Sequence, residues 1–147
     1  MHPRIGRFTS TTLAGDVLRI PGDLGRPTLL VFAYERMQQG DVESWIQAVA
    51  GSNPLRVLEV PVLGRRWLPG RRAINGGMAS QMDRTTREQT MCVYTNVAAF
   101  RRDVLGVTST EILAALVTPD GTVRWHAIGP ADNAGAAALR AAVAELE

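Results

Sequence analysis

The segment Thr28–Tyr34 constrains the fold more than any other part of the sequence, because it is apolar along its whole length. A run of this length without polar alternation is typical of a central strand covered on both faces. A helix is predicted from an N-cap at Asp41 to about Ala50, and a second apolar strand at 55–62. The residues that share one face of this helix are Val42, Trp45, Ile46 and Val49. This order predicts two parallel strands joined by a helix.

The rest of the chain continues the alternation of strands and helices. Its predicted elements are, in chain order, a hairpin turning at 14–16, a strand at 90–95, a helix from Asn96 to Gly106, a hairpin of strands 112–117 and 123–128, and a helix at 133–146. Parallel strands, an antiparallel hairpin at the sheet edge and a closing helix predict an α/β fold, in which helices flank a central mixed sheet. A single domain over residues 1–147 is expected.

Residues 63–88 interrupt this order. The segment is rich in proline and glycine, and we expect an irregular insertion with one short helix at 79–84. It also carries most of an unusual charge, since the chain has 16 arginines and no lysine. Residues 61–102 hold eight of those arginines and only two acidic residues, a net charge of +6, whereas the remainder of the chain sums to −4. The insertion is therefore predicted to be cationic.

Composition excludes several chemistries. Without lysine, the chain has no Schiff-base lysine and no P-loop lysine. A single cysteine, Cys92, excludes an internal disulfide and a zinc site built on paired cysteines, and two histidines are too few for a metal site, so neither a metal nor a cofactor is expected. The sequence has no apolar run of about 18 residues and no signal-peptide stretch. We therefore expect no transmembrane segment and a cytoplasmic location, with peripheral contact to a membrane as the alternative.

The segment TLAGDVLRIPGDLGRPTLLVFAYE, residues 12–35, resembles the opening of redoxins and peroxiredoxins, and the order of elements over 8–146 resembles the thioredoxin fold. The resemblance implies that the position of the C-x-x-C motif falls on Met37-Gln38-Gln39-Gly40, where both cysteines are missing. The cis-proline of thioredoxins would fall near 110–112, which contains no proline. These departures imply a thioredoxin-like domain that has lost dithiol redox chemistry.

Residues 85–146 carry a narrower resemblance. Thr95, the run Phe100–Gly106, and the hairpin Asp120–Trp125 followed by Gly129 are similar to the mitochondrial ATPase complex assembly factor family of the Atp-ten type. The resemblance implies a role in chaperoning a membrane subunit into ATP synthase. Because the chain shows no mitochondrial presequence, a prokaryotic relative of that family is expected.

The loop that occupies the active-site position of the fold is the first candidate binding site. Backbone N–H groups at the start of the following helix, with Arg36 beside them, are predicted to hold an anion. The alternative is a solvated loop left after the loss of catalysis. The residues of this candidate site are Glu35, Arg36, Met37, Gln38, Gln39 and Gly40.

A cluster of arginines around a tryptophan is the second candidate. Guanidinium groups bind carboxylate and phosphate in bidentate fashion, so the cluster predicts contact with an acidic protein or with phospholipid headgroups rather than with nucleic acid. The alternative is again a solvated loop, and Pro69 and Gly70 are expected to prevent an amphipathic helix through it. The residues of this arginine cluster are Arg65, Arg66, Trp67, Arg71 and Arg72.

The third candidate is the pair Arg124 and Trp125 on the edge hairpin. Strand alternation predicts that Trp125 shares one face with Val123 and Ala127, and packing is the alternative role for this tryptophan. An exposed edge strand of this kind also offers a route to a homodimer.

Cys92 is the only candidate nucleophile of the redox kind, and its position within an apolar run predicts a buried thiol with a raised pKa. The leading hypothesis is a non-redox thioredoxin-fold binding protein, an assembly or chaperone-like factor whose partner is a protein such as a membrane-complex subunit. The alternative is an enzyme, a redoxin-type thiol reductase or one-cysteine peroxidase that uses Cys92.

Overall fold

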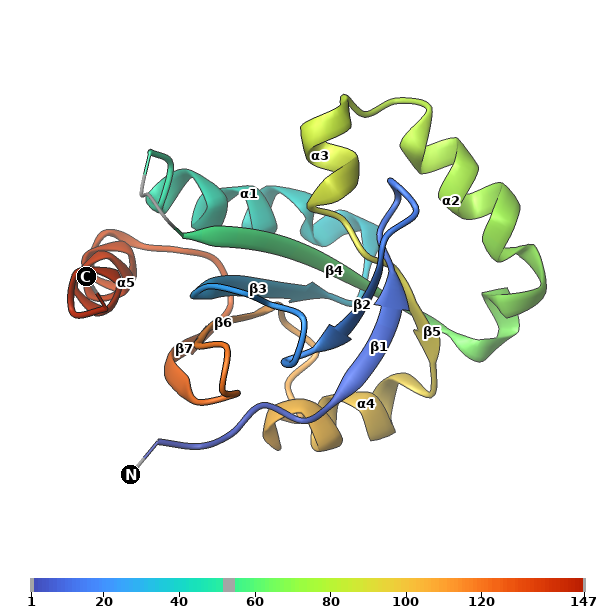
Figure 1. Ribbon diagram of the computed structural model, residues 1–147. Helices are drawn as coiled ribbons and strands as arrows, with labels where there is room; N and C mark the ends of the chain where they lie inside the picture. The colour runs from blue at the N-terminus through green and yellow to red at the C-terminus, as the bar shows by residue number, and fades with distance from the viewer. Residues whose placement is uncertain (1, 52–54, 147) are drawn as a thin grey trace.

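A five-stranded sheet forms the centre of the computed structural model, which describes residues 2–51 and 55–146 (Figure 1). The order across the sheet is β5-β4-β3-β6-β7. Strands β3, β4 and β5 are parallel, β6 is antiparallel to β3, and β7 is antiparallel to β6. The bounds are β3 Thr28–Ala33, β4 Arg56–Gly64, β5 Val93–Thr95, β6 Leu113–Val117 and β7 Val123–Ile128. The predicted mixed sheet is confirmed.

The apolar segment at 28–34 forms β3, the middle strand of that sheet. Its residues Leu29–Phe32 are fully buried, because the strand has neighbours on both edges and side-chain layers on both faces. On one face, α1 (Gln39–Ala48) and α5 (Asn133–Ala144) bury Trp45 and Leu139 against β3 and β6. The uniform apolarity of the segment reflects this double coverage.

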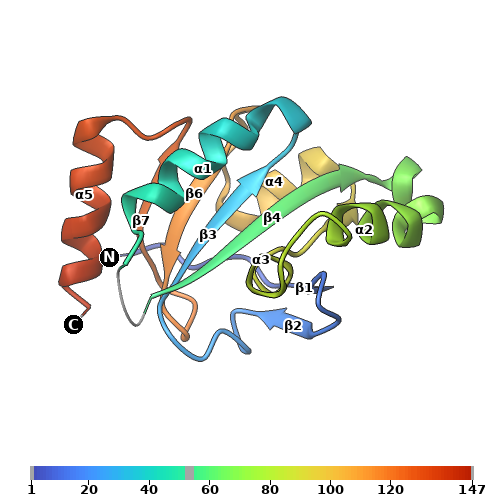
Figure 2. The same ribbon diagram turned by 90° about the horizontal axis from the view of Figure 1, so that it is seen from above.

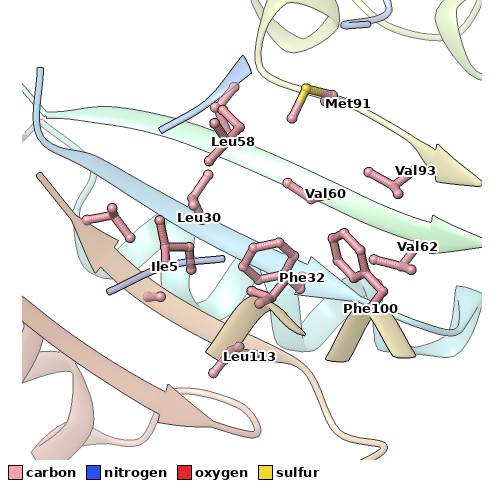
Figure 3. Close-up of a cluster of buried hydrophobic side chains, with 14 of the residues drawn as sticks. Ile5, Leu30, Phe32, Leu58, Val60, Val62, Met91, Val93, Phe100 and Leu113 are labelled. Carbon is pink, nitrogen blue, oxygen red and sulfur yellow. The ribbon is translucent and has the colours of Figure 1, made fainter. Parts of the chain in front are cut away.

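The other face carries α4 (Val97–Leu105) and an antiparallel hairpin of β1 (Phe8–Thr11) and β2 (Val17–Ile20). Figure 3 shows this core, in which Phe32 from the sheet meets Phe100 from α4. Phe8 completes an edge-to-face trio, with ring centroids 5.2 Å from Phe100 and 5.9 Å from Phe32. The N-terminal hairpin is therefore part of the core. None of the helices in the described ranges is long and apolar enough to cross a membrane.

The prediction for residues 63–88 is wrong in its helices. The segment contains a 3-10 helix, η2 (Arg65–Gly70), and two α-helices, α2 (Arg71–Ala79) and α3 (Arg84–Glu88). No helix spans 79–84, and strand β4 extends to Gly64. Pro69 lies within the 3-10 helix and does not block α2, because α2 begins two residues later.

Two further expectations need correction. Helix α1 begins at Gln39, after a 3-10 turn η1 (Arg36–Gln38), so Asp41 lies in its first turn and is not its N-cap. Val123 and Trp125 do not share a face, because the register between β6 and β7 shifts at Leu116/Val117. Val123 joins the core beside α4, whereas Trp125 packs on the side of α1 and α5. An irregularity of this kind breaks the two-residue alternation on which the expectation rested.

Candidate functional site

Three loops meet where the parallel strands β3, β4 and β5 end. The carboxyl ends of parallel strands lie at one edge of a sheet, and open α/β sheets bind ligands outside that edge. Ala33 at the end of β3 pairs with Pro61, so β4 continues three residues further, to Gly64, and pairs there with β5. Figure 2 shows β4 running past β3 toward α2. The extra length of β4 leaves a recess between α1 and α2.

That recess is a cleft of about 1210 Å³, with its floor on the sheet and its walls on the helices. The loop 35–40 contributes one wall, and the insertion contributes the other. Its apolar lining is Val31, Ala33, Val42, Val60, Pro61, Val62, Leu63, Trp67, Ala73, Ile74, Met78, Met82 and Val97. Its charged lining is Glu35, Arg36, Glu59 and Arg66. The structure therefore brings the first two candidate sites together.

Helix α2 forms the outer wall of the cleft. No residue of α2 is buried, and none belongs to either core cluster. Ile74 and Met78, four residues apart, are half-buried and line the cleft. Two contacts attach the helix to β5 and to the residue before it: Tyr94 donates a hydrogen bond to Asn75 Oδ1 at 2.6 Å, and Met78 Sδ lies 3.8 Å from Cys92 Sγ. The apolar side of α2 thus faces an open recess.

The arginine cluster is exposed along η2 and the first turn of α2. The Arg66 guanidinium lies 5.1 Å from the centre of the Trp67 ring, a cation–π contact. Trp67 is 46% exposed and Leu68 is 40% exposed, so this surface carries apolar as well as cationic groups. Within the described parts of the chain, the ion pairs are Arg19–Asp23 and Arg84–Glu88, so the cluster has no internal counter-charge.

The loop 35–40 is held by the side chain of Gln38. Its amide oxygen accepts hydrogen bonds from the N–H groups of Tyr34 (2.8 Å) and Glu35 (3.1 Å). Its amide nitrogen donates to the carbonyl of Thr110 at 2.7 Å, which joins the loop to the segment before β6. Gln38 is thus engaged within the protein, while Met37 beside it is 91% exposed.

The anion site at the helix start in this loop stays a prediction, and two of its N–H groups have partners within the protein. The N–H groups of Gln38 and Gln39 donate to the carbonyls of Glu35 and Arg36 in the 3-10 turn. These donors are therefore already engaged. The exposed Arg36 side chain is the cationic group of this loop that lines the cleft.

Glu59 is a cleft residue that the sequence analysis missed. It lies within β4, and Gln39 Nε2 donates to its Oε1 at 3.1 Å. Burial raises the pKa of Glu59; the hydrogen bond from Gln39 opposes this effect, and the Glu43 carboxylate adds to it. The available signal was a lone acid within an apolar strand, between Leu58 and Val60.

Arg101 and Tyr34 form a second cation–π contact behind the loop, 4.8 Å from guanidinium to ring centre. Arg101 Nη1 donates to the Ser109 carbonyl, whereas Nε is buried and has no partner among the described residues. Burial raises the pKa of Tyr34 to about 12, against the opposing effect of Arg101. This arginine is therefore part of the packing and not of the exposed cluster.

Cys92 lies directly before β5 and is 2% exposed. Burial raises the pKa of its thiol to about 11, the Glu59 carboxylate adds to this rise, and Tyr94 opposes it. A neutral, covered thiol is a poor nucleophile, so the alternative of thiol catalysis is not favoured. Among the residues that the structure describes, no three histidine, cysteine, aspartate or glutamate side chains gather to hold a metal ion.

Arg124 and Trp125 lie apart from the cleft. They are on β7, which is the opposite edge strand from β5. Trp125 packs edge-to-face on Trp45 with ring centres 5.0 Å apart, and Trp45 Nε1 donates to the Gly129 carbonyl at 2.7 Å. Trp125 thus contributes to packing, while the Arg124 side chain is exposed.

The sequence matches no protein-family model and no curated protein. Solved structures do resemble the chain. BsSco, a member of the Sco family of cytochrome c oxidase assembly proteins, is 11% identical with a TM-score of 0.62, and the match covers 98% of this chain and 95% of that one. Yeast Sco1 with copper bound is 11% identical with a TM-score of 0.63, over 99% and 95%.

A third structure, the exposed lipoprotein thioredoxin Etrx1 of Streptococcus pneumoniae, is 15% identical with a TM-score of 0.61, over 95% of this chain and 99% of that one. At such identities the likeness concerns the fold. Together with the sheet order and the N-terminal hairpin, these matches show that the chain has a thioredoxin-like fold.

Proposed function

We propose that this chain is a non-redox binding protein, which holds a protein partner in the cleft at the carboxyl ends of β3 and β4. One observation carries the proposal: the cleft lies beside the loop where the fold does its thiol chemistry, and Met37-Gln38-Gln39-Gly40 there contains no cysteine. Open apolar lining remains at this place, beside arginines that form no ion pair with any residue that the structure describes. Recognition without catalysis is the function that such a surface supports.

An assembly or chaperone-like role is the finer part of this proposal. Its support is the resemblance of residues 85–146 to the Atp-ten type of ATPase assembly factors, and the description of the structural neighbour BsSco as a member of a family of cytochrome c oxidase assembly proteins. Both concern proteins that help to build membrane complexes. The proposed partner is accordingly a subunit of such a complex, met by a peripheral factor.

The reactivity of Cys92 tests the absence of thiol chemistry. At a pKa of about 11 rather than 9, the thiolate fraction at neutral pH falls roughly a hundredfold, and burial slows access further. A chromogenic disulfide reagent should therefore label the native protein at least about a hundred times more slowly than the unfolded chain. Labelling near the rate of free cysteine, or peroxide consumption that Cys92→Ser abolishes, would refute the proposal.

Site-specific photo-crosslinking tests the place of binding. A photoreactive amino acid at Met37, which is highly exposed beside the cleft, should capture a protein partner in cells of the source organism. The matched control is the same amino acid at His126, an exposed residue of β7 at the far side of the sheet. Capture of the same partner from both positions, or from His126 alone, would show that the cleft is not the binding site.

A further inference from the structure

We infer that the partner segment held in the cleft is acidic, with a large apolar side chain inserted between β4 and α2 and carboxylates placed on the arginine cluster. This inference rests on the proposed function, and it adds the chemistry of the bound segment. It follows from three features of the cleft: its apolar depth, the net positive charge at its rim, and its concave shape between two helices.

The depth of the cleft is apolar. Ile74, Met78 and Met82 line the recess from the insertion, and the half-buried Pro61 and Leu63 line it from β4. Thioethers are flexible and polarizable, so methionine surfaces adapt to apolar guests of different shape. Pockets of roughly 300–1,000 Å³ hold a small molecule, so a cleft of about 1210 Å³ has room for several side chains. An apolar anchor residue would bury surface that α2 now leaves open to water.

The rim of the cleft is cationic. Arg36 and Arg66 line it, and Arg65, Arg71 and Arg72 stand exposed beside them. Two carboxylates also line the cleft. Glu59 is half-buried and bonded to Gln39, and Glu35 lies on the loop. With the neighbouring Glu43 included, five guanidiniums against three carboxylates leave a net positive rim, and guanidinium forks pair best with carboxylates. Charge complementarity therefore selects an acidic segment.

The shape of the site favours a peptide over a lipid surface. The apolar groups line a recess between two helices, and a flat bilayer does not enter a concave site. Exposed Trp67 lines this recess, and exposed Leu68 follows it in η2, so that apolar surface continues outward from the recess. An extended chain segment reaches both the depth and the rim at once, since successive side chains point to opposite sides.

Two neighbouring glycines of α2 provide a matched pair of variants. A Cβ at Gly76 or at Gly77 would meet nothing within 4 Å, so both positions accept a side chain. Gly77 lines the cleft, whereas Gly76 does not. Gly77→Leu should therefore fill the recess, and Gly76→Leu is its control on the same helix. Both substitutions favour helix formation, which keeps the comparison free of folding defects.

The binding experiment uses a fluorescent peptide in which glutamates flank one phenylalanine, with two matched peptides that replace the glutamates by glutamine or the phenylalanine by serine. The full chain should bind the first peptide at least about tenfold more tightly than either control. Gly77→Leu should weaken binding about tenfold, and Gly76→Leu less than about twofold. Replacing the four cluster arginines by glutamine should remove the preference for glutamate, and added salt should weaken binding.

Equal binding of the glutamate and glutamine peptides would overturn the inference, and so would equal effects of the two glycine variants. Binding to vesicles of anionic phospholipid, without binding to the peptide, would assign the cluster to membranes instead. These failures differ from failure of the proposed function. A non-acidic partner crosslinked at Met37 refutes the inference alone, whereas crosslinking only at His126 refutes the cleft as the binding site.

Discussion

Helices α4 and α2 each have nine residues, and each follows a parallel strand, yet their sequences differ in how well they stabilise a helix. In α4, the Asn96 side chain caps the first turn by accepting from the Ala99 N–H, and Gly106 ends the helix with a left-handed φ of 72°. Phe100 and Val104 are buried. The side-chain cap, the apolar face and the terminating glycine all favour the same helix. Such agreement between local signals is expected of a helix that forms part of the core.

Helix α2 lacks the side-chain cap, the buried face and the terminating glycine. It has no side-chain cap, it buries no residue, and it contains two consecutive glycines. Arg71 and Arg72 lie in its first turn, where the helix dipole disfavours cations by about 0.3–1 kcal/mol each. Each glycine costs a further 0.8–1.0 kcal/mol or so relative to alanine. The difference teaches that α4 is selected for stability, while α2 keeps charge and open apolar surface at a cost in stability.

The largest expected effect is the loss of the α4 core contact. Phe100→Ala should lower the free energy of unfolding by about 3–5 kcal/mol, because it opens a cavity among Phe8 and Phe32. Ile74→Ala in α2 should cost less than about 1 kcal/mol, since that side chain is outside both core clusters. Urea denaturation measures both. Similar losses for the two variants would break the contrast between the helices.

A smaller effect is expected from exchanging glycine and alanine in the two helices, and it distinguishes the local stability of α2 from the global stability of the fold. Gly76→Ala should slow amide hydrogen exchange within α2 by roughly two- to fivefold, because alanine favours the helix by about 0.5–1 kcal/mol and open space surrounds the position. The substitution Ala98→Gly, at an exposed position of α4, should instead lower the global free energy of unfolding by about 1 kcal/mol. A change in global stability from Gly76→Ala would show that α2 unfolds together with the core.

The smallest effect concerns Glu59 in the cleft beside α2. Burial raises the pKa of Glu59 above its ordinary value of 4.5, so the folded chain holds that proton more tightly than the unfolded chain. The contribution to stability is largest in acid and declines as the pH rises through the folded pKa. Glu59→Gln should therefore raise the urea midpoint at neutral pH and match the wild type below pH 4.5 or so.

Glu43→Gln provides a companion test. It removes a like charge that contributes to the raised pKa of Glu59, so it should shift the urea midpoint at neutral pH in the same direction by a smaller amount. Parallel pH curves for wild type and Glu59→Gln would show that Glu59 has the same pKa in the folded and unfolded chains.

Most of the fold was predictable from local signals. The apolar run of β3, the helix that starts at Asn96 and the hairpin of β6 and β7 were predictable, because residues close in sequence determine them. Helix α2 was missed because its glycines and its arginine-rich first turn oppose helix formation, and only the spacing of Ile74 and Met78 favours it. The shift at Leu116/Val117 depends on how two strands fit together, which neither strand reveals alone.

The sequence predicted the two segments that form the candidate site, but it did not predict the contacts that Gln38 and Glu59 make there. Once β3 and β4 are parallel neighbours, the loop 35–40 and the arginine cluster must follow adjacent strand ends. The internal role of Gln38 was hidden, because its partner Thr110 is distant in sequence. Glu59 was hidden for a similar reason, since its burial depends on the cleft formed by the insertion.

The three hydrogen bonds of the Gln38 amide have a consequence for binding entropy. A flexible loop loses conformational freedom when it meets a partner, and this loss subtracts from the affinity. The loop 35–40 is instead anchored to Tyr34, Glu35 and Thr110 before any partner arrives. Folding has already ordered one wall of the cleft, so a bound segment would have to order only itself and the α2 side.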